Sequence, residues 1–281
     1  MVTFLSKLIS SLETKKSHVC VGLDSRYDRI PELIKKGKSV SEAIFEFNKN
    51  VVEATHEYTS AYKSNVAFYA GFGEEGLKGL QKTNEFLKTN YSDIPLLADC
   101  KRSEMGESVK MIKAEIFDWL QFDCVMVTPW FGFDTVRDYL DEEKNGVCVY
   151  VHDSNPTAEE FQEVELKDGR RLYEYVTERV CQVWNVSGNV FIEAGATYPE
   201  ALKKVRKIAG DDMVILTAGV GTQGGKVEDL KGVFGKDGQR LLVNSSRGII
   251  FAGENKPDYF VAVKESAQQL RNTLRSASKI S

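Results

Sequence analysis

Short apolar runs alternate with amphipathic stretches along most of the chain. Several of these runs are apolar at consecutive positions and rich in β-branched residues, which is typical of strands covered on both faces in a parallel sheet. The pattern predicts eight strands, at residues 18–23, 59–63, 94–99, 123–128, 147–152, 189–194, 213–218 and 240–244.

The stretches between the runs have the periodicity of helices. Ser39 and Glu42 have the spacing of a capping box, and Ile44, Phe47 and Val51 then mark one apolar face. Similar faces are marked by Leu77, Leu80 and Leu87, by Val109, Ile112, Ile116 and Leu120, and by Phe260, Val263 and Leu270 after Pro257.

Eight strands that alternate with helices predict a single (β/α)₈ barrel over residues 1–281, with a loose C-terminal tail after about residue 275. A doubly wound open sheet is the alternative fold. Polar residues favour the barrel, because they fall at or just after the C-terminal ends of successive runs, where barrel enzymes form their active sites. These residues are Asp24, Lys63, Asp99, Lys101, Ser154, Thr197, the segment 219–225 and Arg247.

Composition narrows the class of protein. The formal net charge of -4 gives no electrostatic footprint for nucleic acid or anionic lipid. No apolar run approaches the length of about 18 residues that spans a bilayer, and residues 1–16 lack the apolar core of a signal peptide. The five cysteines include no CxxC pair and mostly lie in apolar runs, which indicates buried thiols in a reducing compartment. We expect a cytoplasmic protein with no nucleic-acid or membrane partner.

Charged residues gather in the segment 96–108. Asp99 and Lys101 are two residues apart on a predicted strand, so both side chains should point to the same side, and Glu104 follows three residues later. Lys63 adds a second ammonium group from the neighbouring strand. The array is a candidate catalytic site, and the alternative is an interior salt-bridge network without a catalytic role.

A second signal indicates phosphate binding. Glycines at positions 219, 221, 224 and 225 follow the seventh run, and Arg247 follows the eighth. The loops after strands seven and eight are the usual phosphate site of this barrel, and arginine adds a bidentate donor. The glycines match neither a P-loop nor GxGxxG, and tight-turn geometry is their alternative explanation.

Other candidates carry less chemistry. His152 ends a predicted strand, and we expect a structural role for it. Cys100 lies between Asp99 and Lys101 and should face the helices, which favours packing over nucleophilic catalysis. The sequence shows no cluster with metal-ligand spacing.

Several motifs together resemble the orotidine 5′-phosphate decarboxylase family, in particular its longer bacterial and protist branch. They occur in order from VGLDSR (21–26) to Arg247, and comprise AYKSNVAFY (61–69), LADCKRSEMG (97–106), DSNP (153–156), GATYPE (195–200), GVGTQGG (219–225) and SSRGI (245–249). The resemblance implies a homodimeric (β/α)₈ barrel that converts orotidine monophosphate to uridine monophosphate and carbon dioxide without metal or organic cofactor.

The resemblance also implies roles for individual residues. Lys101 would protonate C6 as carbon dioxide leaves, Asp99 would lie beside the departing carboxylate, and Lys63 would orient Asp99 and contact the ribose. Asp24 would contact the ribose hydroxyls, and Ser154 the pyrimidine edge. The phosphate would be held by Gln223, Gly224 and Arg247. Glu104 and Ser108 would reach across a dimer interface into the partner's site.

The chain departs from the family pattern at several positions. Glu104 stands where the motif ends in aspartate, and the added methylene moves the carboxylate by about 1 Å, a shift that can cost roughly a hundredfold in rate. Asp153, Ala218 and Trp130 also differ from common family residues. Two other functions stay open: a metal-dependent sugar-phosphate decarboxylase or aldolase, and a nucleotide-binding relative without turnover.

Overall fold

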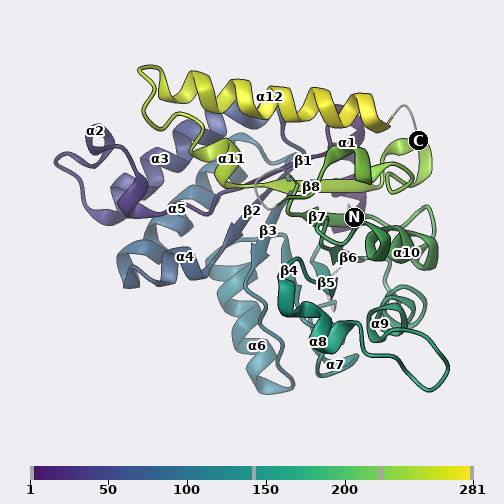
Figure 1. Ribbon diagram of the computed structural model, residues 1–281. Helices are drawn as coiled ribbons and strands as arrows, with labels where there is room; N and C mark the ends of the chain where they lie inside the picture. Colours follow the sequence, from purple (N-terminus) through teal and green to yellow (C-terminus); the bar gives the residue numbers. More distant parts are fainter. Residues whose placement is uncertain (1–2, 141–143, 221–223, 279–281) are drawn as a thin grey trace.

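The computed structural model describes residues 3–140, 144–220 and 224–278. In this part of the chain, parallel strands pair in chain order and the last pairs with the first, which closes a barrel (Figure 1). The strands are β1 (Val19–Gly22), β2 (Ala61–Asn65), β3 (Leu96–Asp99), β4 (Cys124–Val127), β5 (Gly146–His152), β6 (Val190–Ala194), β7 (Ile215–Ala218) and β8 (Leu241–Ser245). The predicted (β/α)₈ barrel is confirmed, and the open-sheet alternative is wrong.

The apolar runs form strands because both faces of the barrel wall are covered. All residues of β1, β3, β4, β5 and β6 are buried. β2 differs most from its predicted bounds, since it begins two residues later and continues to Asn65. Thr59 caps the preceding segment instead, where its hydroxyl group donates to the carbonyl of Thr55. Lys63 therefore lies within the strand, not at its end.

Helices surround the barrel (Figure 1). They are α1 (Phe4–Lys15), α2 (Glu32–Lys35), α3 (Val40–Thr55), α4 (Ala67–Ala70), α5 (Gly73–Asn90), α6 (Glu107–Lys113), α7 (Asp134–Arg137), α8 (Glu159–Gln162), α9 (Leu172–Arg179), α10 (Pro199–Ala209), α11 (Arg247–Ile250) and α12 (Tyr259–Ser278). Short 3₁₀ turns occupy Tyr27–Arg29, His56–Tyr58, Pro156–Ala158, Val227–Leu230 and Lys236–Gly238, and π-helical segments occupy Ala114–Trp119 and Val180–Trp184.

The predicted capping box at the start of α3 is confirmed. The backbone N–H of Glu42 donates to Ser39 Oγ at 3.2 Å, and the backbone N–H of Ser39 donates to Glu42 Oε2 at 2.9 Å. Ile44, Phe47 and Val51 are buried along one face of the helix, which packs against α5. This local signal and the apolar face together fix where α3 begins and which side it buries.

The helix after β3 changes its winding part-way. α6 ends at Lys113 and continues as the π-helical segment, in which the N–H of Leu120 donates to the carbonyl of Glu115, five residues earlier. Val109, Ile116 and Leu120 are buried as the spacing predicted.

The C-terminal helix extends further than the sequence suggested. α12 runs along the barrel beside α3 and β1 (Figure 1) and continues to Ser278, with Leu274 buried. Residues 275–278 therefore belong to α12, and the loose tail expected after about residue 275 does not begin there. Residues 279–281 lie outside the described part of the chain.

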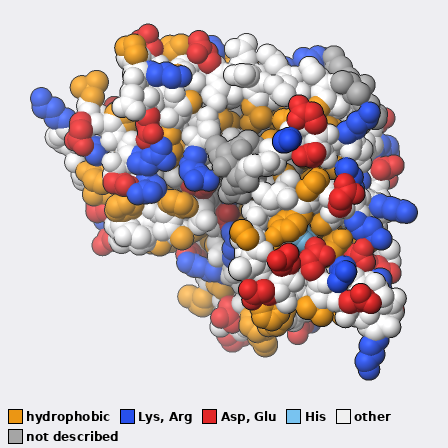
Figure 2. Space-filling view, in the orientation of Figure 1, with side chains coloured by type: hydrophobic (Ala, Val, Ile, Leu, Met, Phe, Trp, Pro, Cys, Tyr) orange, Lys and Arg blue, Asp and Glu red, His pale blue; other side chains and the backbone are white. Residues whose placement is uncertain are grey.

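The surface carries charges of both signs. Acidic and basic side chains are interspersed over the face in Figure 2. Among the described helices, none combines the length and apolar character needed to cross a membrane.

Candidate active site

A cavity of about 530 Å³ opens at the C-terminal ends of the barrel strands. Its walls come from the strand ends and the loops that follow them. The lining residues are Asp24, Arg26, Arg29, Lys63, Asn65, Phe68, Asp99, Lys101, Tyr150, Asp153, Ser154, Asn155, Glu193, Ala218, Gly219, Val220, Asn244, Ser245, Ser246, Arg247 and Phe251. Most of the polar strand ends singled out in the sequence therefore converge on one mouth. Of the described residues among them, Thr197, Gly224 and Gly225 do not line the cavity.

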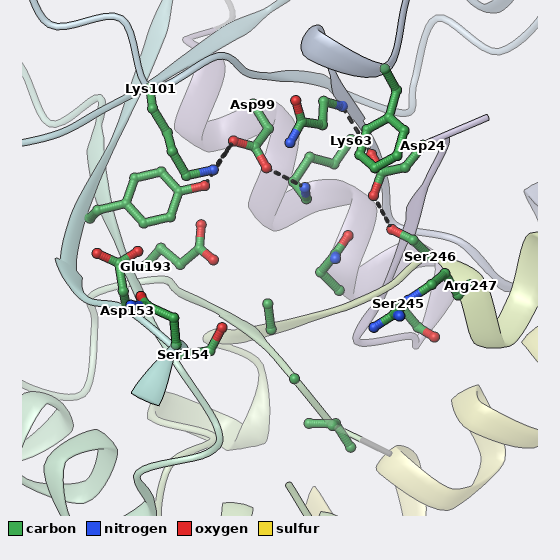
Figure 3. Close-up of a pocket in the computed structure, with 18 of the residues that line it drawn as sticks. Asp24, Lys63, Asp99, Lys101, Asp153, Ser154, Glu193, Ser245, Ser246 and Arg247 are labelled. Atoms are coloured by element: carbon green, nitrogen blue, oxygen red, sulfur yellow. Dashed lines mark hydrogen bonds and ion pairs between the residues drawn. The ribbon is translucent and has the colours of Figure 1, made fainter. Parts of the chain in front are cut away.

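Asp99 is the centre of a charged cluster in this cavity. Its Oδ2 lies 2.7 Å from Lys63 Nζ, and its Oδ1 lies 2.6 Å from Lys101 Nζ, so the two ammonium groups bind different oxygens (Figure 3). The Tyr150 hydroxyl group also donates to Oδ1, at 2.9 Å. Asp99, Lys63 and Tyr150 are buried.

The cluster fixes the charge of its members. Burial by itself would raise the pKa of Asp99, but Lys63 and Lys101 outweigh it and hold that pKa well below its usual range. Burial would likewise lower the pKa of Lys63, but the surrounding carboxylates, Asp99 foremost, outweigh it and hold that pKa above its ordinary value. The cavity thus contains a carboxylate and a buried ammonium group that stay ionised at neutral pH.

Lys101 reaches Asp99 by a different route from the one expected. β3 ends at Asp99, and Lys101 has left-handed backbone with φ 51°, so strand alternation does not orient its side chain. The loop conformation turns the side chain back over the cavity, where its ammonium group lies 4.6 Å from the centre of the Tyr150 ring. The predicted proximity is confirmed, but the predicted reason for it is wrong.

Cys100 packs as expected. It lies against the hydrophobic core, and its thiol is directed to the carbonyl of Met126 on the neighbouring strand. Burial raises the pKa of this thiol to about 11, which disfavours the thiolate that a nucleophile needs.

Asp24 follows β1 and is held on both carboxylate oxygens. The backbone N–H of Asn65 donates to Oδ1 at 3.0 Å, and the Ser246 hydroxyl group donates to Oδ2 at 2.5 Å (Figure 3). The close approach of Ser246 depends on Gly22, because a Cβ atom at this position would lie 1.8 Å from Ser246 Oγ. Glycine at the end of β1 therefore allows Ser246, the residue after β8, to support Asp24.

Ser154 lies at the opposite side of the mouth, in the loop after β5. Its carbonyl accepts a hydrogen bond from the Thr197 hydroxyl group at 2.9 Å. A Cβ atom at Gly195 would come within 2.8 Å of the Ser154 backbone, so glycine lets the loops after β5 and β6 touch. The neighbouring Asp153 makes two hydrogen bonds with the side-chain amide of Gln162. The backbone N–H of Asp153 donates to Gln162 Oε1, and Gln162 Nε2 donates to the Asp153 carboxylate.

His152 does not line the cavity. The register between β5 and β6 shifts between Tyr150 and His152, which breaks the alternation of sides. The His152 ring is buried between Tyr173 and Tyr198 and contacts Glu163 at 2.8 Å. This environment supports the structural role expected for it.

Three arginines line the other end of the cavity. Arg247 begins α11 directly after β8 and is exposed, Arg26 pairs with Asp28, and Arg29 makes a bidentate pair with Glu254. The loop after β7 returns on itself, because the N–H of Gly225 donates to the carbonyl of Gly219 at 3.0 Å. Gly224 is exposed and outside the lining of the cavity, and Gln223 lies outside the described residues.

Glu104 and Ser108 stay away from the cluster within one chain. Both are exposed, and neither lines the cavity. The structure thus brings together Lys63, Asp99 and Lys101 but not Glu104, because the chain leaves the barrel mouth after Lys101 and enters α6.

Sequence reasoning missed several polar residues of the cavity, among them Glu193, Tyr150 and Ser246. Glu193 interrupts the apolar run of β6, and this acidic residue within an apolar run was the available signal. Tyr150 looked like an ordinary strand aromatic. Ser246 acts through Asp24. This contact joins the loop after the first strand to the loop after the last strand, and no local pattern in the sequence reveals it.

Comparisons with known proteins identify the family of this barrel. Residues 17–259 match a model of the orotidine 5′-phosphate decarboxylase / HUMPS family. The chain belongs to this family. Orotidine 5′-phosphate decarboxylase of Cellvibrio japonicus is 33% identical over 277 residues, covering 98% of this chain and 99% of that one. The protein of the same name from Christiangramia forsetii is 35% identical over 270 residues, covering 96% and 97%.

A solved structure in the family agrees with the fold. The Leishmania donovani OMP decarboxylase superposes with a TM-score of 0.80 at 30% sequence identity, and the match covers 98% of this chain and 99% of that one. The family resemblance inferred from the sequence motifs is therefore confirmed, and it extends over nearly the whole barrel.

Proposed function

We propose that this chain decarboxylates orotidine 5′-monophosphate to uridine 5′-monophosphate and carbon dioxide, the last step of de novo UMP synthesis. The observation that carries the proposal is the pair of ammonium groups, Lys63 and Lys101, held on the two oxygens of one buried carboxylate at the mouth of a family barrel. The near-full-length relatives named as orotidine 5′-phosphate decarboxylases support it.

Lys101 is the proposed general acid. Loss of carbon dioxide leaves negative charge on the pyrimidine carbon, and an ammonium group fixed nearby stabilises that charge where it develops. The same group then supplies the proton. Its side chain is partly exposed in the cavity, whereas Lys63 is buried, so Lys101 is the better placed of the two to meet a ligand.

Asp99 is proposed to act on the substrate carboxylate. Because Asp99 is ionised, it disfavours a second carboxylate beside it more than the neutral carbon dioxide into which that group turns. Binding energy from distant parts of the substrate offsets this unfavourable placement. Lys63 holds Asp99 in orientation through its 2.7 Å contact.

The rest of the nucleotide is proposed to extend across the mouth. Asp24 contacts the ribose hydroxyls, and Ser154 contacts the pyrimidine edge from the other side. Arg247 holds the phosphate, with Gln223 and Gly224 contributing from the loop after β7. The position of Asp24, Ser154 and Arg247 around one cavity supports this assignment.

We further propose a homodimer with shared active sites. Glu104 and Ser108 are exposed beside the mouth and unused by their own cavity, which is what residues reaching into a partner's site require. The glutamate would then meet the charged cluster of the partner, in the role of the family's aspartate.

The metal-dependent alternative is not favoured. Both oxygens of Asp99 are already engaged by ammonium groups, and both oxygens of Asp24 accept hydrogen bonds. Within the described ranges, no group of three or more His, Cys, Asp or Glu side chains has the arrangement of a metal site. We propose a reaction without metal or organic cofactor, and a cytoplasmic location, which the five free thiols support.

The test is the loss of orotidine monophosphate absorbance on addition of purified enzyme, with and without EDTA. We expect equal turnover in both samples. Turnover that EDTA abolishes would favour the metal-dependent alternative. Tight binding of uridine monophosphate without any turnover would indicate a relative that has lost the chemistry.

A further inference from the structure

A buried carboxyl group in the cavity, that of Glu193, has no role in the proposed mechanism. Glu193, on β6, is 7% exposed and lines the cavity, and Figure 3 shows its carboxyl group pointing into it in the direction of Asp99. Its Oε2 is buried and has no hydrogen-bond partner among the residues that the structure describes. An unsatisfied buried polar group costs about 1–3 kcal/mol, so its presence in an otherwise apolar strand calls for a function.

The polar neighbours of Glu193 make their hydrogen bonds to Asp99. Tyr150 is its register partner on β5, but the Tyr150 hydroxyl group donates to Asp99. Lys63 and Lys101 are each engaged by an Asp99 oxygen. Oε2 of Glu193 is therefore left available to a ligand in this part of the cavity.

Glu193 differs from Asp99 in its protonation. Burial, reinforced by the Asp99 carboxylate, raises the pKa of Glu193 to about 8, against the smaller opposing effect of the two lysines. At neutral pH the group is mostly a carboxylic acid, which has one O–H to donate. The cavity thus contains one ionised and one neutral carboxyl group. Such a difference in pKa between two acids is typical of sites in which the two acids have different roles.

We propose that Glu193 determines substrate specificity by donating a hydrogen bond to the carboxylate of the bound substrate. This inference rests on the proposed function. The carboxylate must lie beside Asp99 and Lys101, because Lys101 has to reach the carbon from which carbon dioxide departs. A neutral carboxylic acid directed at that place can donate its O–H to the negatively charged substrate carboxylate, whereas an ionised glutamate would repel it.

The same contact distinguishes substrate from product. Uridine monophosphate has no group at the position of the departed carboxylate, so on decarboxylation the Glu193 O–H loses its acceptor. A buried donor left without an acceptor weakens binding, so the site should bind uridine monophosphate less tightly than orotidine monophosphate. Glu193 therefore favours entry of the substrate and release of the product.

The experiment compares the two nucleotides on Lys101→Ala protein, so that the substrate is not consumed during titration. Dissociation constants for orotidine monophosphate and uridine monophosphate are measured by calorimetry in this background, alone and combined with Glu193→Leu or Glu193→Gln. Glu200→Gln is the matched control, because Glu200 lies on α10 outside the cavity.

We expect Glu193→Leu to weaken binding of orotidine monophosphate about tenfold or more, the size of a lost hydrogen bond to a charged group, and that of uridine monophosphate less than about threefold. Glu193→Gln retains an N–H donor and should retain the preference, as should the control. Equal effects of Glu193→Leu on both nucleotides, or none on the substrate, would overturn the proposal. Retained binding of uridine monophosphate shows that the leucine variant is folded.

A pH series gives a second readout. The titratable groups that face Glu193 are Lys63 on β2, Asp99 at the end of β3, Lys101 after it, Tyr150 and Cys148 on β5, and Cys20 on β1. With Lys101 replaced, the pKa of each remaining neighbour is displaced away from the range between pH 7 and 9.5: the pKa of Asp99 is lowered, and those of Lys63, Tyr150, Cys148 and Cys20 are raised.

Glu193 loses its donor proton, and becomes negative, as the pH rises through its own pKa. Removal of the Lys101 ammonium raises that pKa further, so the midpoint of the change lies above pH 8. We expect the preference for orotidine monophosphate over uridine monophosphate to decline toward pH 9.5, and to stay constant in the Glu193→Gln protein. A preference that changes equally in both proteins would contradict the inference.

These outcomes are separable from failure of the proposed function. If the chain is not the decarboxylase, the wild-type protein consumes no orotidine monophosphate, whether or not it binds a nucleotide. If only the Glu193 inference is wrong, the wild-type protein turns over its substrate, and the Glu193 variants bind both nucleotides with unchanged preference.

Discussion

The ammonium group of Lys101 lies 2.6 Å from Oδ1 of Asp99, although β3 ends at Asp99 and Lys101 lies in the loop that follows. Left-handed backbone at Lys101 brings the side chain back over the cavity. The contact is therefore held by a loop conformation, and the ammonium group is partly exposed where a ligand would meet it.

Replacement of this lysine removes the proposed acid and its positive charge together. We expect Lys101→Ala to lower kcat by about 10⁴-fold or more, because general-acid and electrostatic contributions are each worth about 10²-fold or more. Stability should change little, since Lys63 continues to pair with Asp99. Single-turnover decarboxylation and thermal unfolding measure the two effects.

Lys101→Arg is the informative companion variant. Arginine retains the charge but does not give up a proton at neutral pH, so it should also be inactive. A near-wild-type kcat in either variant would remove Lys101 from the chemical step.

Gly22 gives a prediction about the ribose end. In Gly22→Ala the new methyl group would lie 1.8 Å from Ser246 Oγ, so Ser246 must move and its hydrogen bond to Asp24 is lost. We expect a raised KM and a loss of about 1–3 kcal/mol in unfolding free energy from overpacking. Steady-state kinetics and chemical denaturation report these two quantities.

Ser246→Ala separates the two effects of that change. It removes the same hydrogen bond without the clash, so it should raise KM while the unfolding free energy changes less than in Gly22→Ala. If Gly22→Ala has wild-type KM and stability, the close approach of β1 and β8 does not support Asp24.

The sequence predicts the barrel well because its signals are local. Each strand shows itself as a buried apolar run, and α3 shows itself by a capping box whose two hydrogen bonds form between Ser39 and Glu42. The convergence of Lys63 and Asp99 then follows from topology, since β2 and β3 are parallel neighbours and both residues lie toward the same end of the sheet.

The rest depends on tertiary contacts that a local pattern does not contain. The left-handed turn at Lys101 breaks the alternation from which its orientation was argued. The register shift after Tyr150 sends His152 outward. Ser246 becomes part of the site only because β8 lies beside the glycine that ends β1.

Arg247 gives a prediction about the phosphate. Its side chain is exposed at the cavity before a ligand binds, so Arg247→Ala should leave stability unchanged and lower affinity. Loss of a charge-assisted hydrogen bond of about 1.5–3 kcal/mol corresponds to a KM raised roughly 10- to 100-fold. Arg137→Ala, on α7 outside the cavity, is the control and should have wild-type KM. Unchanged KM in Arg247→Ala would mean that the phosphate binds elsewhere.

Glu104 provides the test of shared active sites. We expect Lys101→Ala and Glu104→Ala proteins each to be inactive alone. If Glu104 serves the partner's cavity, a mixed dimer has one site that carries both substitutions and one site that carries neither. Random exchange makes half of the dimers mixed, so activity should recover to about a quarter of the wild-type value per subunit.

The opposite geometry gives a different result. If Glu104 serves the cavity of its own chain, each site of the mixed dimer keeps one substitution, and no activity returns. Subunit exchange must be demonstrated independently, by native mass spectrometry of differently tagged chains. Exchange without recovery, or full activity of Glu104→Ala alone, would contradict shared sites. Recovery near a quarter would show that this glutamate, one methylene longer than the family's aspartate, completes the charged cluster from across the interface.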